Sequence, residues 1–312
     1  MKPPVMLYAC HQVDQDAWLS ALAAADPGLE VRVWPDIGDP AEIDYAFLWK
    51  QPRGILDGLV NLKAIFSLGA GVDHVLRDDS LPDHVPLVRM VDPTLVSGMV
   101  EFVVMRVLHY HRHMPAYERQ QRDGFWRPLP QVPAAQRRVG ILGLGELGAA
   151  AGRALAGLGF DVTGWSRTAR DLAGLRCVAG ADGLTFLLEQ AEILVCLLPL
   201  TDDTRGILNR DTLSRLPRGA FLINAARGGH LVEADLIPLL DTGHLAGATL
   251  DVFAVEPLPA GHPFWFHPAI TVLPHAAAVT HPVTAARIIA GNIARHRAGQ
   301  GLVNVVDRQR GY

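Results

Sequence analysis

Short apolar runs alternate along this chain with longer stretches whose apolar residues recur at helical spacing. In the first third, the runs predict strands at Val5–Ala9, Val31–Trp34, Phe47–Trp49 and Ala64–Phe66. Asp14 can cap an intervening helix that runs to about Ala25. Because the runs are separated by turns rich in proline, glycine and aspartate, the pattern favours alternating strands and helices, which is an α/β layout.

The alternation resumes after a predicted long helix, Val96–His113, and a loop that contains Gly124–Pro130. The later strands are predicted at Arg138–Leu142, Asp161–Trp165, Glu192–Leu198, Phe221–Ala225, Ala248–Val252 and Ile270–Leu273. A final helix begins at Pro282 and reaches about Ala298. Near-continuous apolar strands separated by helices indicate a doubly wound parallel sheet that is covered on both faces.

A glycine motif stands where one of these strands meets the next helix. Residues 143–148 read Gly-Leu-Gly-Glu-Leu-Gly and follow directly on the run that ends at Leu142. The first glycine permits a tight turn, the second lets a pyrophosphate approach the backbone, and the third lets helix and strand pack closely. The helix start also offers N–H groups and a positive dipole end. We therefore expect a dinucleotide to contact Gly143, Gly145, Glu146, Leu147 and Gly148.

The end of the second strand of this half indicates which dinucleotide is bound. NAD-specific sheets of this kind carry an acidic residue about 20 positions after the motif. Here the strand ends in Ser166, Arg167 and Thr168, and no carboxylate stands there. An arginine attracts a ribose 2′-phosphate and can bind it through two hydrogen bonds, and the hydroxyls can add donors. We expect NADP, with NAD accepted at lower preference; the alternative is that Arg167 is a solvated loop residue.

Three later segments each place a polar residue just after an apolar strand. They deliver Arg227, Glu256 and His275. In an open α/β sheet, ligands bind outside the carboxyl ends of the strands, so these residues are candidates for one crevice. An arginine fork can hold a carboxylate, a histidine can pass a proton at neutral pH, and a glutamate can orient that histidine. With a nicotinamide, this set is typical of a 2-keto acid reductase, although spacing alone also allows a structural role for each residue.

Composition narrows the remaining classes. The formal charge of −4 gives no reason to expect nucleic-acid binding. The three cysteines are far apart and suggest neither a disulfide framework nor a zinc site. On a predicted helix, His111 points away from His109 and His113, which have the i, i+4 spacing of a metal-binding pair. No nearby carboxylate completes such a site, so we expect no metal. Without a signal-peptide pattern or an apolar stretch of membrane-spanning length, we expect a cytoplasmic protein with no membrane partner.

The chain resembles the D-2-hydroxyacid dehydrogenase family over essentially its whole length. The matching segments are Gly143–Gly148, Leu197–Thr201, Asn224–Gly228, Asp251–Phe253, Glu256–Pro257 and Pro274–His275. Within the family, it is most similar to the glyoxylate/hydroxypyruvate reductase A group. The additional matches are Trp49–Lys50, Leu68–Asp73, Trp126–Pro130, Trp165–Thr168, Val306–Arg308 and Arg310–Tyr312.

The resemblance implies two doubly wound parallel-sheet domains, Rossmann-like and flavodoxin-like, with an active-site cleft between them. A discontinuous substrate domain would comprise residues 1–99 and 284–312, and the NAD(P)-binding Rossmann domain residues 100–283. NADPH would deliver hydride to the keto carbon of a small 2-keto acid. Arg227 would bind the carboxylate and keto oxygen of the substrate, His275 would donate the proton, and Glu256 would support His275.

The resemblance also implies further contacts. The substrate would meet Trp49 and the backbone N–H groups of the turn Leu68, Gly69, Ala70 and Gly71, and such amide clusters suit anions. The cofactor would also lie near Leu198, Pro199, Thr204, Ala225, Ala226 and Asp251, and near Arg227 and His275. The apolar face of the Val96–His113 helix either packs inside the monomer or pairs across a two-fold axis in a homodimer, with Phe125 and Trp126 covering the partner's cleft.

Other functions remain to be weighed against a reductase. A dinucleotide-sensing co-repressor has a similar pocket, but would carry tails or a peptide groove that we do not expect here. Formate and phosphite dehydrogenases share the fold, yet Arg167 and the Trp49 region favour a small 2-keto acid. Phosphoglycerate dehydrogenases often add a regulatory domain, for which this chain is too short. Reduction of a different 2-keto acid stays open, since a pocket distinguishes one carbon by only about 1–3 kcal/mol.

Overall fold

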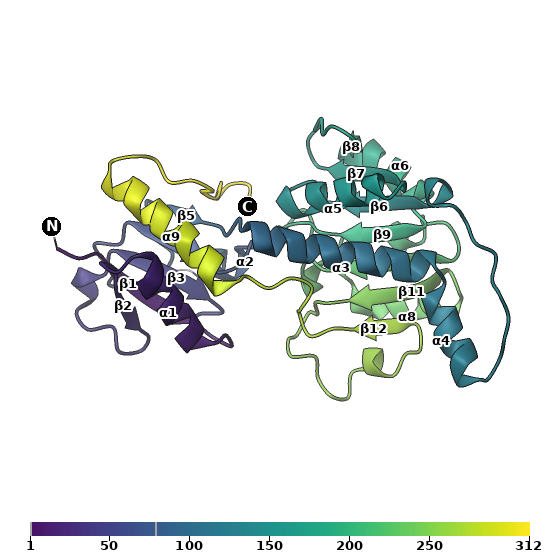
Figure 1. Ribbon diagram of the computed structural model, residues 1–312, viewed down its shortest axis with the longest axis horizontal. Helices are drawn as coiled ribbons and strands as arrows, with labels where there is room; N and C mark the ends of the chain where they lie inside the picture. Colours follow the sequence, from purple (N-terminus) through teal and green to yellow (C-terminus); the bar gives the residue numbers. More distant parts are fainter. Residues whose placement is uncertain (1, 79) are drawn as a thin grey trace. The chain divides into compact units, whose positions relative to one another are not determined.

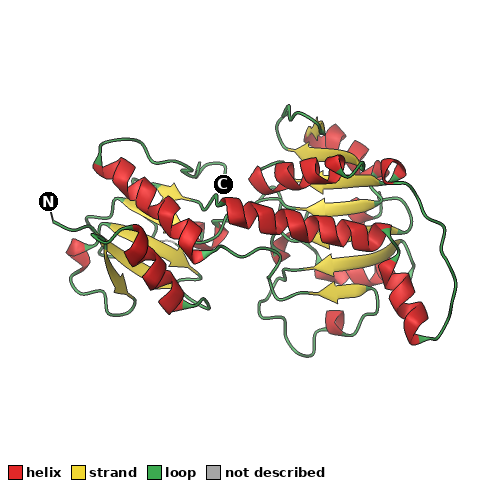
Figure 2. Ribbon diagram, viewed as in Figure 1, coloured by secondary structure: helices red, strands yellow, loops and turns green. Residues whose placement is uncertain are grey.

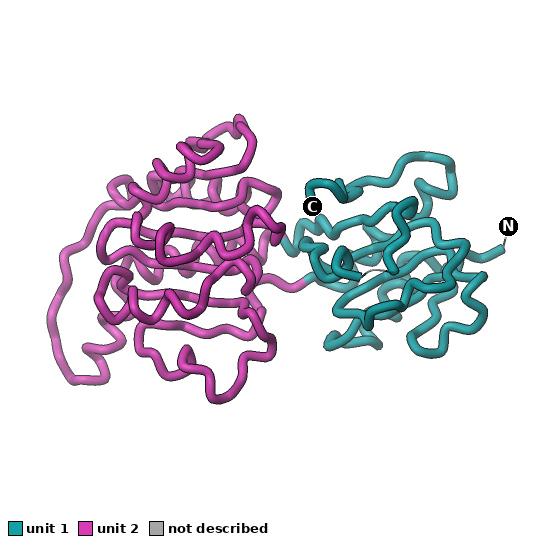
Figure 3. The backbone as a smooth tube through the Cα atoms, turned by 180° about the vertical axis from the view of Figure 1, so that it is seen from behind, with its two compact units in different colours: residues 1–95, 280–312 teal, residues 96–279 magenta. Residues whose placement is uncertain are grey.

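The computed structural model describes residues 2–78 and 80–312, and the chain divides into two compact units (Figure 3). Unit 1 contains the residues up to Leu95 and those from Thr280 onward, and unit 2 contains Val96–Val279. The junctions therefore follow Leu95 and Val279, against expected junctions after residues 99 and 283. Substrate binding by unit 1 and cofactor binding by unit 2 stay predictions at this point.

Unit 1 is built on a five-stranded sheet in the order β2-β1-β3-β4-β5, in which all neighbouring strands are parallel (Figure 1). Its strands are β1 (Val5–Cys10), β2 (Glu30–Val33), β3 (Tyr45–Trp49), β4 (Ala64–Ser67) and β5 (Leu87–Val88). Its helices are α1 (Gln15–Ala25), α2 (Asp73–Leu76) and α9 (Pro282–Arg297), with a 3₁₀ turn at Pro40–Glu42.

Alternation along β1 shows how the unit 1 sheet is buried on both faces. Met6 and Tyr8 pack into one core with residues of α1 and α9, such as Trp18 and Ile289. Leu7 points into the opposite core, which contains the buried apolar side chains of the segment 55–62 and of α2. All six residues of β1 are buried. A continuously apolar strand is therefore the expected sequence for this position.

Unit 2 is built on a seven-stranded parallel sheet in the order β12-β11-β10-β9-β6-β7-β8 (Figure 2). Its strands are β6 (Arg138–Leu142), β7 (Asp161–Ser166), β8 (Arg176–Ala179), β9 (Ile193–Cys196), β10 (Ala220–Asn224), β11 (Leu245–Leu250) and β12 (Ile270–Val272). The chain order reverses after β8, so β6 and β9 lie side by side. This reversal is where open sheets bind ligands.

Helices cover both faces of the unit 2 sheet, as the continuous apolar strands predict. One core joins the sheet to α3 (Pro93–His111) and α5 (Glu146–Gly157). The other joins it to α6 (Gly180–Gln190), α7 (Arg210–Leu213) and α8 (Glu233–Asp241). The remaining helical segments are α4 (Met114–Arg122) and 3₁₀ turns at Ala134–Gln136, Gly228–His230 and Pro263–Trp265. The expectation of two doubly wound α/β domains is confirmed.

The predicted long helix, α3, begins at Pro93 and ends at His111 rather than spanning 96–113. Val103 and Val107 are fully buried against the unit 2 sheet. Met105 and Leu108, on another side of the helix, are 47% and 36% exposed. Core packing within unit 2 therefore accounts for one face of α3, and its exposed apolar side chains need a separate explanation. Among the described residues, no helix is long and apolar enough to cross a bilayer.

Candidate active site

The three motif glycines meet three different steric demands. Gly143 has φ +101°, and a Cβ there would lie 2.7 Å from the carbonyl oxygen of Leu197. A Cβ at Gly148 would lie 1.8 Å from the carbonyl oxygen of Gly143, so helix α5 can approach the turn only without a side chain. At Gly145 a Cβ would meet nothing within 4 Å. The turn is therefore closed on its protein side and open at the position where a pyrophosphate is expected.

The open position lies at the start of α5, which gives it a polar character. Gly145 is the N-cap of the helix, and Glu146, Leu147 and Gly148 form the first turn. The first N–H groups of a helix have no partner within it and carry the positive end of the dipole. Backbone space and polarity therefore both fit a dinucleotide phosphate.

The predicted 2′-phosphate residues lie at the end of β7 and directly after it. Ser166 Oγ donates a hydrogen bond to the carbonyl of Thr168 at 2.8 Å. Arg167 forms an ion pair with Asp203, with 2.8 Å between Nη1 and Oδ2. Arg170, which the sequence reasoning missed, donates from Nη1 to the carbonyl of Leu144 inside the glycine motif at 2.9 Å. The only feature of the sequence that could have pointed to Arg170 is its position three residues after Arg167.

The loop after β9 carries the predicted cofactor residues Leu198, Pro199 and Thr204. Leu198 is buried, whereas Pro199 and Thr204 are half-buried. Thr204 Oγ1 donates to the carbonyl of Pro199 at 2.7 Å and accepts from the N–H of Thr201 at 2.9 Å. The threonine therefore fixes a tight turn next to the glycine motif.

The loop after β10 holds Arg227 through buried polar side chains. Asn224 is fully buried; its Oδ1 accepts from the N–H of Ala226, and its Nδ2 donates to the carbonyl of Arg227 at 3.2 Å. His230 is also fully buried, with Nδ1 3.1 Å from the carbonyl oxygen of Arg227 and Nε2 3.2 Å from that of Pro199. The imidazole thus links the Arg227 loop to the loop after β9. Ala225 and Ala226 are buried beside it.

Asp251 follows β11 and holds the loop that carries His275. Its carboxylate oxygens accept from the N–H groups of Ala276 at 2.8 Å and Ala277 at 3.0 Å, and its carbonyl accepts from the N–H of His275. Burial raises the pKa of Asp251, and the two N–H donors counteract part of that rise. His275 itself has φ +56°, a conformation that costs a non-glycine residue energy unless its surroundings impose it. The Asp251 contacts impose it.

His275 and Glu256 form the closest acid–histidine pair of this edge. Nδ1 of His275 lies 2.8 Å from Oε2 of Glu256, and Oε1 of Glu256 accepts from the N–H of Phe253 at 3.2 Å. An ionised carboxylate can only accept, so Nδ1 carries the hydrogen in this contact. The pair fixes the ring orientation, as a proton-transferring histidine requires.

Unit 1 carries the other predicted substrate residues. Trp49 ends β3, and its ring meets that of His74 edge-on, with 4.7 Å between centroids. The turn Leu68–Gly71 follows β4; a Cβ at Gly69 would lie 2.7 Å from the Trp49 ring. Thr280 Oγ1 and Ser67 Oγ donate to the carbonyls of Leu68 and Gly69. The turn and the tryptophan are therefore in contact within unit 1.

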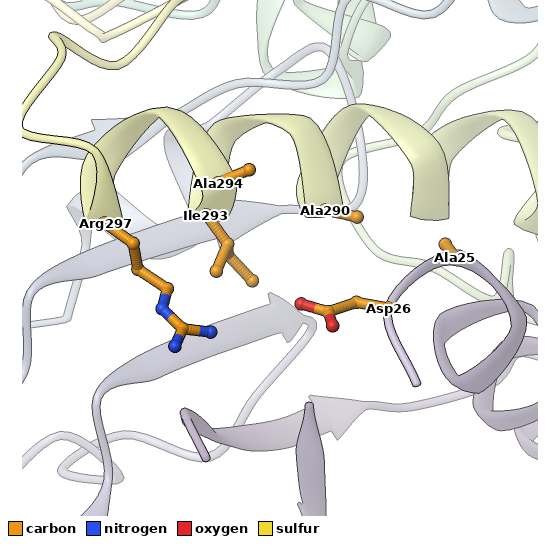
Figure 4. A pocket seen from close by; sticks show the side chains of 6 residues that line it. All are labelled: Ala25, Asp26, Ala290, Ile293, Ala294 and Arg297. Carbon is orange, nitrogen blue, oxygen red and sulfur yellow. The ribbon is translucent and has the colours of Figure 1, made fainter. Parts of the chain in front are cut away.

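A separate hollow of about 380 Å³ lies between the end of α1 and α9, with the side chains of Asp26 and Arg297 on its wall (Figure 4). None of the predicted site residues lines it. Across residues 2–78 and 80–312, no cluster of three or more His, Cys, Asp or Glu side chains is arranged to hold a metal ion.

Comparison with known proteins gives consistent results. A sequence model of the D-isomer specific 2-hydroxyacid dehydrogenase family, NAD binding domain, matches residues 104–277. The chain is 43% identical over 300 residues to a glyoxylate/hydroxypyruvate reductase A from Yersinia enterocolitica, covering 95% of this chain and 96% of that protein. Two solved structures are similar over 99% of this chain and all of theirs.

The first of these structures is a D-isomer specific 2-hydroxyacid dehydrogenase from Xanthobacter autotrophicus Py2 in complex with NADPH and MES, with a TM-score of 0.95 and 47% identity. The second is an NADPH-dependent glyoxylate/hydroxypyruvate reductase from Sinorhizobium meliloti in complex with NADP and sulfate, with a TM-score of 0.94 and 42% identity.

Proposed function

The chain belongs to the D-isomer specific 2-hydroxyacid dehydrogenase family, and we propose that it reduces small 2-keto acids with NADPH, converting glyoxylate to glycolate and hydroxypyruvate to D-glycerate. The observation that carries this proposal is the Glu256–His275 pair at the carboxyl-terminal edge of the sheet that also carries the glycine turn. A proton donor and a dinucleotide-binding turn at one sheet edge are the two parts that a hydride-transferring reductase requires. The names of similar proteins support the same substrates.

The residues present fit the cofactor. The open position at Gly145 and the start of α5 suit the pyrophosphate, and Ser166, Arg167 and Thr168 suit a 2′-phosphate. When bound, NADPH supplies a hydride to the keto carbon. Leu198, Pro199, Thr204, Ala225, Ala226 and Asp251 are proposed to flank it. NADH is proposed as a poorer cofactor because a hydroxyl gives Arg167 no anion to bind.

The chain's own residues complete the reaction. We assign the substrate carboxylate and the polarised keto oxygen to Arg227, whose guanidinium can donate two parallel hydrogen bonds. His275 transfers a proton from Nε2 to the keto oxygen as the hydride arrives at carbon, so that the carbonyl becomes a hydroxyl. Glu256 holds Nδ1 and stabilises the imidazolium before transfer. Trp49 and the N–H groups of Gly69, Ala70 and Gly71 are assigned to the rest of the substrate, whereas the N–H of Leu68 donates to the carbonyl of Leu48 at 3.1 Å.

The test is steady-state loss of reduced-cofactor absorbance with glyoxylate and with hydroxypyruvate, each with NADPH and with NADH. We expect turnover of both acids, with a higher kcat/KM for NADPH than for NADH. Tight NADPH binding without turnover of either acid would overturn the proposed substrates. Turnover with equal use of both cofactors would overturn only the NADP preference.

We also propose that the protein acts in the cytoplasm as a homodimer. Its three cysteines are free thiols, as is usual for proteins of a reducing compartment. Met105 and Leu108 on α3 are exposed, as are Phe125 at 58% and Trp126 at 97%, and a second copy would cover such side chains. Sizing with light scattering at micromolar concentration should give twice the chain mass; a monodisperse monomer would refute the dimer.

A further inference from the structure

The arginine proposed to bind the 2′-phosphate is already engaged by a carboxylate. Arg167 Nη1 lies 2.8 Å from Oδ2 of Asp203, a residue 36 positions further along the chain. The side chains are 45% and 68% exposed, so the ion pair stands in solvent. Exposed ion pairs of this kind are weak, and either partner can be drawn away by a stronger one.

The two loops that carry this ion pair lie on either side of the proposed cofactor site. Arg167 follows β7 and Asp203 lies in the loop after β9, and in the sheet order these strands flank β6, whose carboxyl end is the glycine turn. The Arg167–Asp203 contact therefore joins the two loops on either side of the turn that would receive the cofactor. Asp203 is presented from a rigid turn, because the hydroxyl of Thr204 and the carbonyl of Thr201 close hydrogen bonds around it.

We propose that Asp203 is a specificity-determining residue that limits the preference for NADPH over NADH by competing with the 2′-phosphate for Arg167. A phosphate with a charge near −2 must displace the carboxylate from the guanidinium before it can bind there, and breaking the ion pair costs binding energy. A ribose 2′-hydroxyl has no such conflict, and a carboxylate can accept its hydrogen bond, as acidic residues do in NAD-specific sheets. This inference rests on the proposed NADPH site, and its test is a binding measurement rather than turnover.

The experiment measures dissociation constants for NADPH, NADH and 2′,5′-ADP by titration calorimetry in the full-length Asp203→Asn protein. Asp202→Asn is the matched control, because Asp202 is the adjacent exposed carboxylate and its substitution changes the net charge equally. We expect Asp203→Asn to tighten NADPH and 2′,5′-ADP about 2- to 5-fold, the range of an exposed ion pair. NADH should not tighten, and Asp202→Asn should leave the NADPH-to-NADH ratio unchanged.

A second variant makes the result specific to the ion pair. In an Arg167→Ala background, Asp203→Asn should lose most of its effect on NADPH, because the competition has no guanidinium left to act on. Equal constants for Asp203→Asn and Asp202→Asn would overturn the proposal. Weaker NADPH binding in Asp203→Asn would also overturn it, because Asp203 would then hold Arg167 ready for the phosphate. Wild-type protein that binds NADPH but reduces neither acid would overturn the proposed reaction and not this inference.

Discussion

The loop between β11 and β12 contributes one residue to each of two glutamate–histidine pairs, and only one of these pairs is proposed to move a proton. Glu256 pairs with His275 at 2.8 Å, and Glu233 pairs with His262 at 3.5 Å. The glutamates accept from neighbouring backbone groups, the N–H of Phe253 and of the residue after it. Side-chain exposure lies between 21% and 28% for all four residues. Residue type and burial therefore do not separate a catalytic pair from a structural one.

The difference lies in which ring nitrogen is used and where the histidine is mounted. Nδ1 of His262 accepts from the N–H of Phe264, so His262 caps the 3₁₀ turn at Pro263–Trp265 while Nε2 faces Glu233. His275 instead uses Nδ1 for its glutamate and stands after β12, at the edge where ligands of parallel sheets bind. A histidine used as a cap supports the chain, whereas one oriented by a carboxylate through Nδ1 is arranged to present Nε2.

The largest difference between the two pairs is expected when each imidazole is removed by substitution with alanine. His275→Ala should lower kcat for glyoxylate or hydroxypyruvate at saturating NADPH by at least about 10²-fold, because a positioned proton donor contributes about 10²–10⁴. His262→Ala should leave kcat within a few-fold and lower the free energy of unfolding by about 0.5–2 kcal/mol, the usual cost of a lost cap. Steady-state kinetics and urea unfolding measure the two effects. If His275→Ala, like His262→Ala, loses only a few-fold in kcat, His275 is not the proton donor.

A smaller effect is expected when each glutamate becomes glutamine. A carboxylate accepts from two donors at once, whereas the single oxygen of a glutamine can face either the N–H of Phe253 or Nδ1 of His275. Loss of one charge-assisted hydrogen bond, about 1.5–3 kcal/mol, should lower kcat of Glu256→Gln about 10- to 100-fold.

Glu233→Gln is the matched control for that substitution, since it makes the same change beside the same loop. It should leave kcat within a few-fold of the wild-type value and leave NADPH affinity, measured by titration, unaltered. If Glu256→Gln behaves like Glu233→Gln in kcat, the orientation of His275 does not depend on Glu256, and the contrast between the pairs fails.

The features of unit 2 that could be predicted from the sequence are those that depend on the type of a single residue or on a continuous apolar run. Gly148 is required because any side chain would overlap the carbonyl of Gly143, so the residue type itself reports the contact. Continuous apolar runs reported strands such as β6 and β9 because both faces of those strands are buried. The same apolar runs made it possible to assign Arg227, Glu256 and His275 to the ends of strands. The distance of 2.8 Å between Nδ1 of His275 and Oε2 of Glu256 is known only from the structure.

Features that depend on residues far away in the sequence, or on elements that are largely exposed to solvent, could not be predicted. The strand β8 lies at the end of the sheet order and is only partly buried, so it lacks an apolar run, and α4 buries no side chain. Asp203 carries no local sign that it meets Arg167, 36 residues away. The roles of Asn224 and His230 were likewise missed, because a buried polar residue shows its purpose only through the carbonyls it contacts. The pattern of residues along the chain therefore predicts burial and backbone strain far better than it predicts which polar side chains form hydrogen bonds or ion pairs.

The smallest expected effect on activity tests whether the mounting of His275 matters apart from its glutamate. Asp251→Asn replaces one acceptor oxygen with an amide donor facing the N–H of Ala276 or Ala277, so one buried donor loses its partner. The free energy of unfolding should fall by about 1–3 kcal/mol. The activity should fall only a few-fold, because the N–H of His275 still bonds to the backbone carbonyl of residue 251.

The pH dependence of that stability loss distinguishes the buried carboxyl from an ordinary surface group. Burial raises the pKa of Asp251 in the folded protein, so the folded state binds the proton more readily than the unfolded chain does. Wild-type stability from this group is therefore present below the ordinary aspartate pKa of 3.8 and is lost as pH rises through the raised value. The gap between wild type and Asp251→Asn should narrow as pH rises above the ordinary aspartate pKa of 3.8 in urea titrations. A gap that widens with pH would instead mean that the N–H groups of Ala276 and Ala277 stabilise the carboxylate more than burial destabilises it, and the pKa of Asp251 would then be lowered rather than raised.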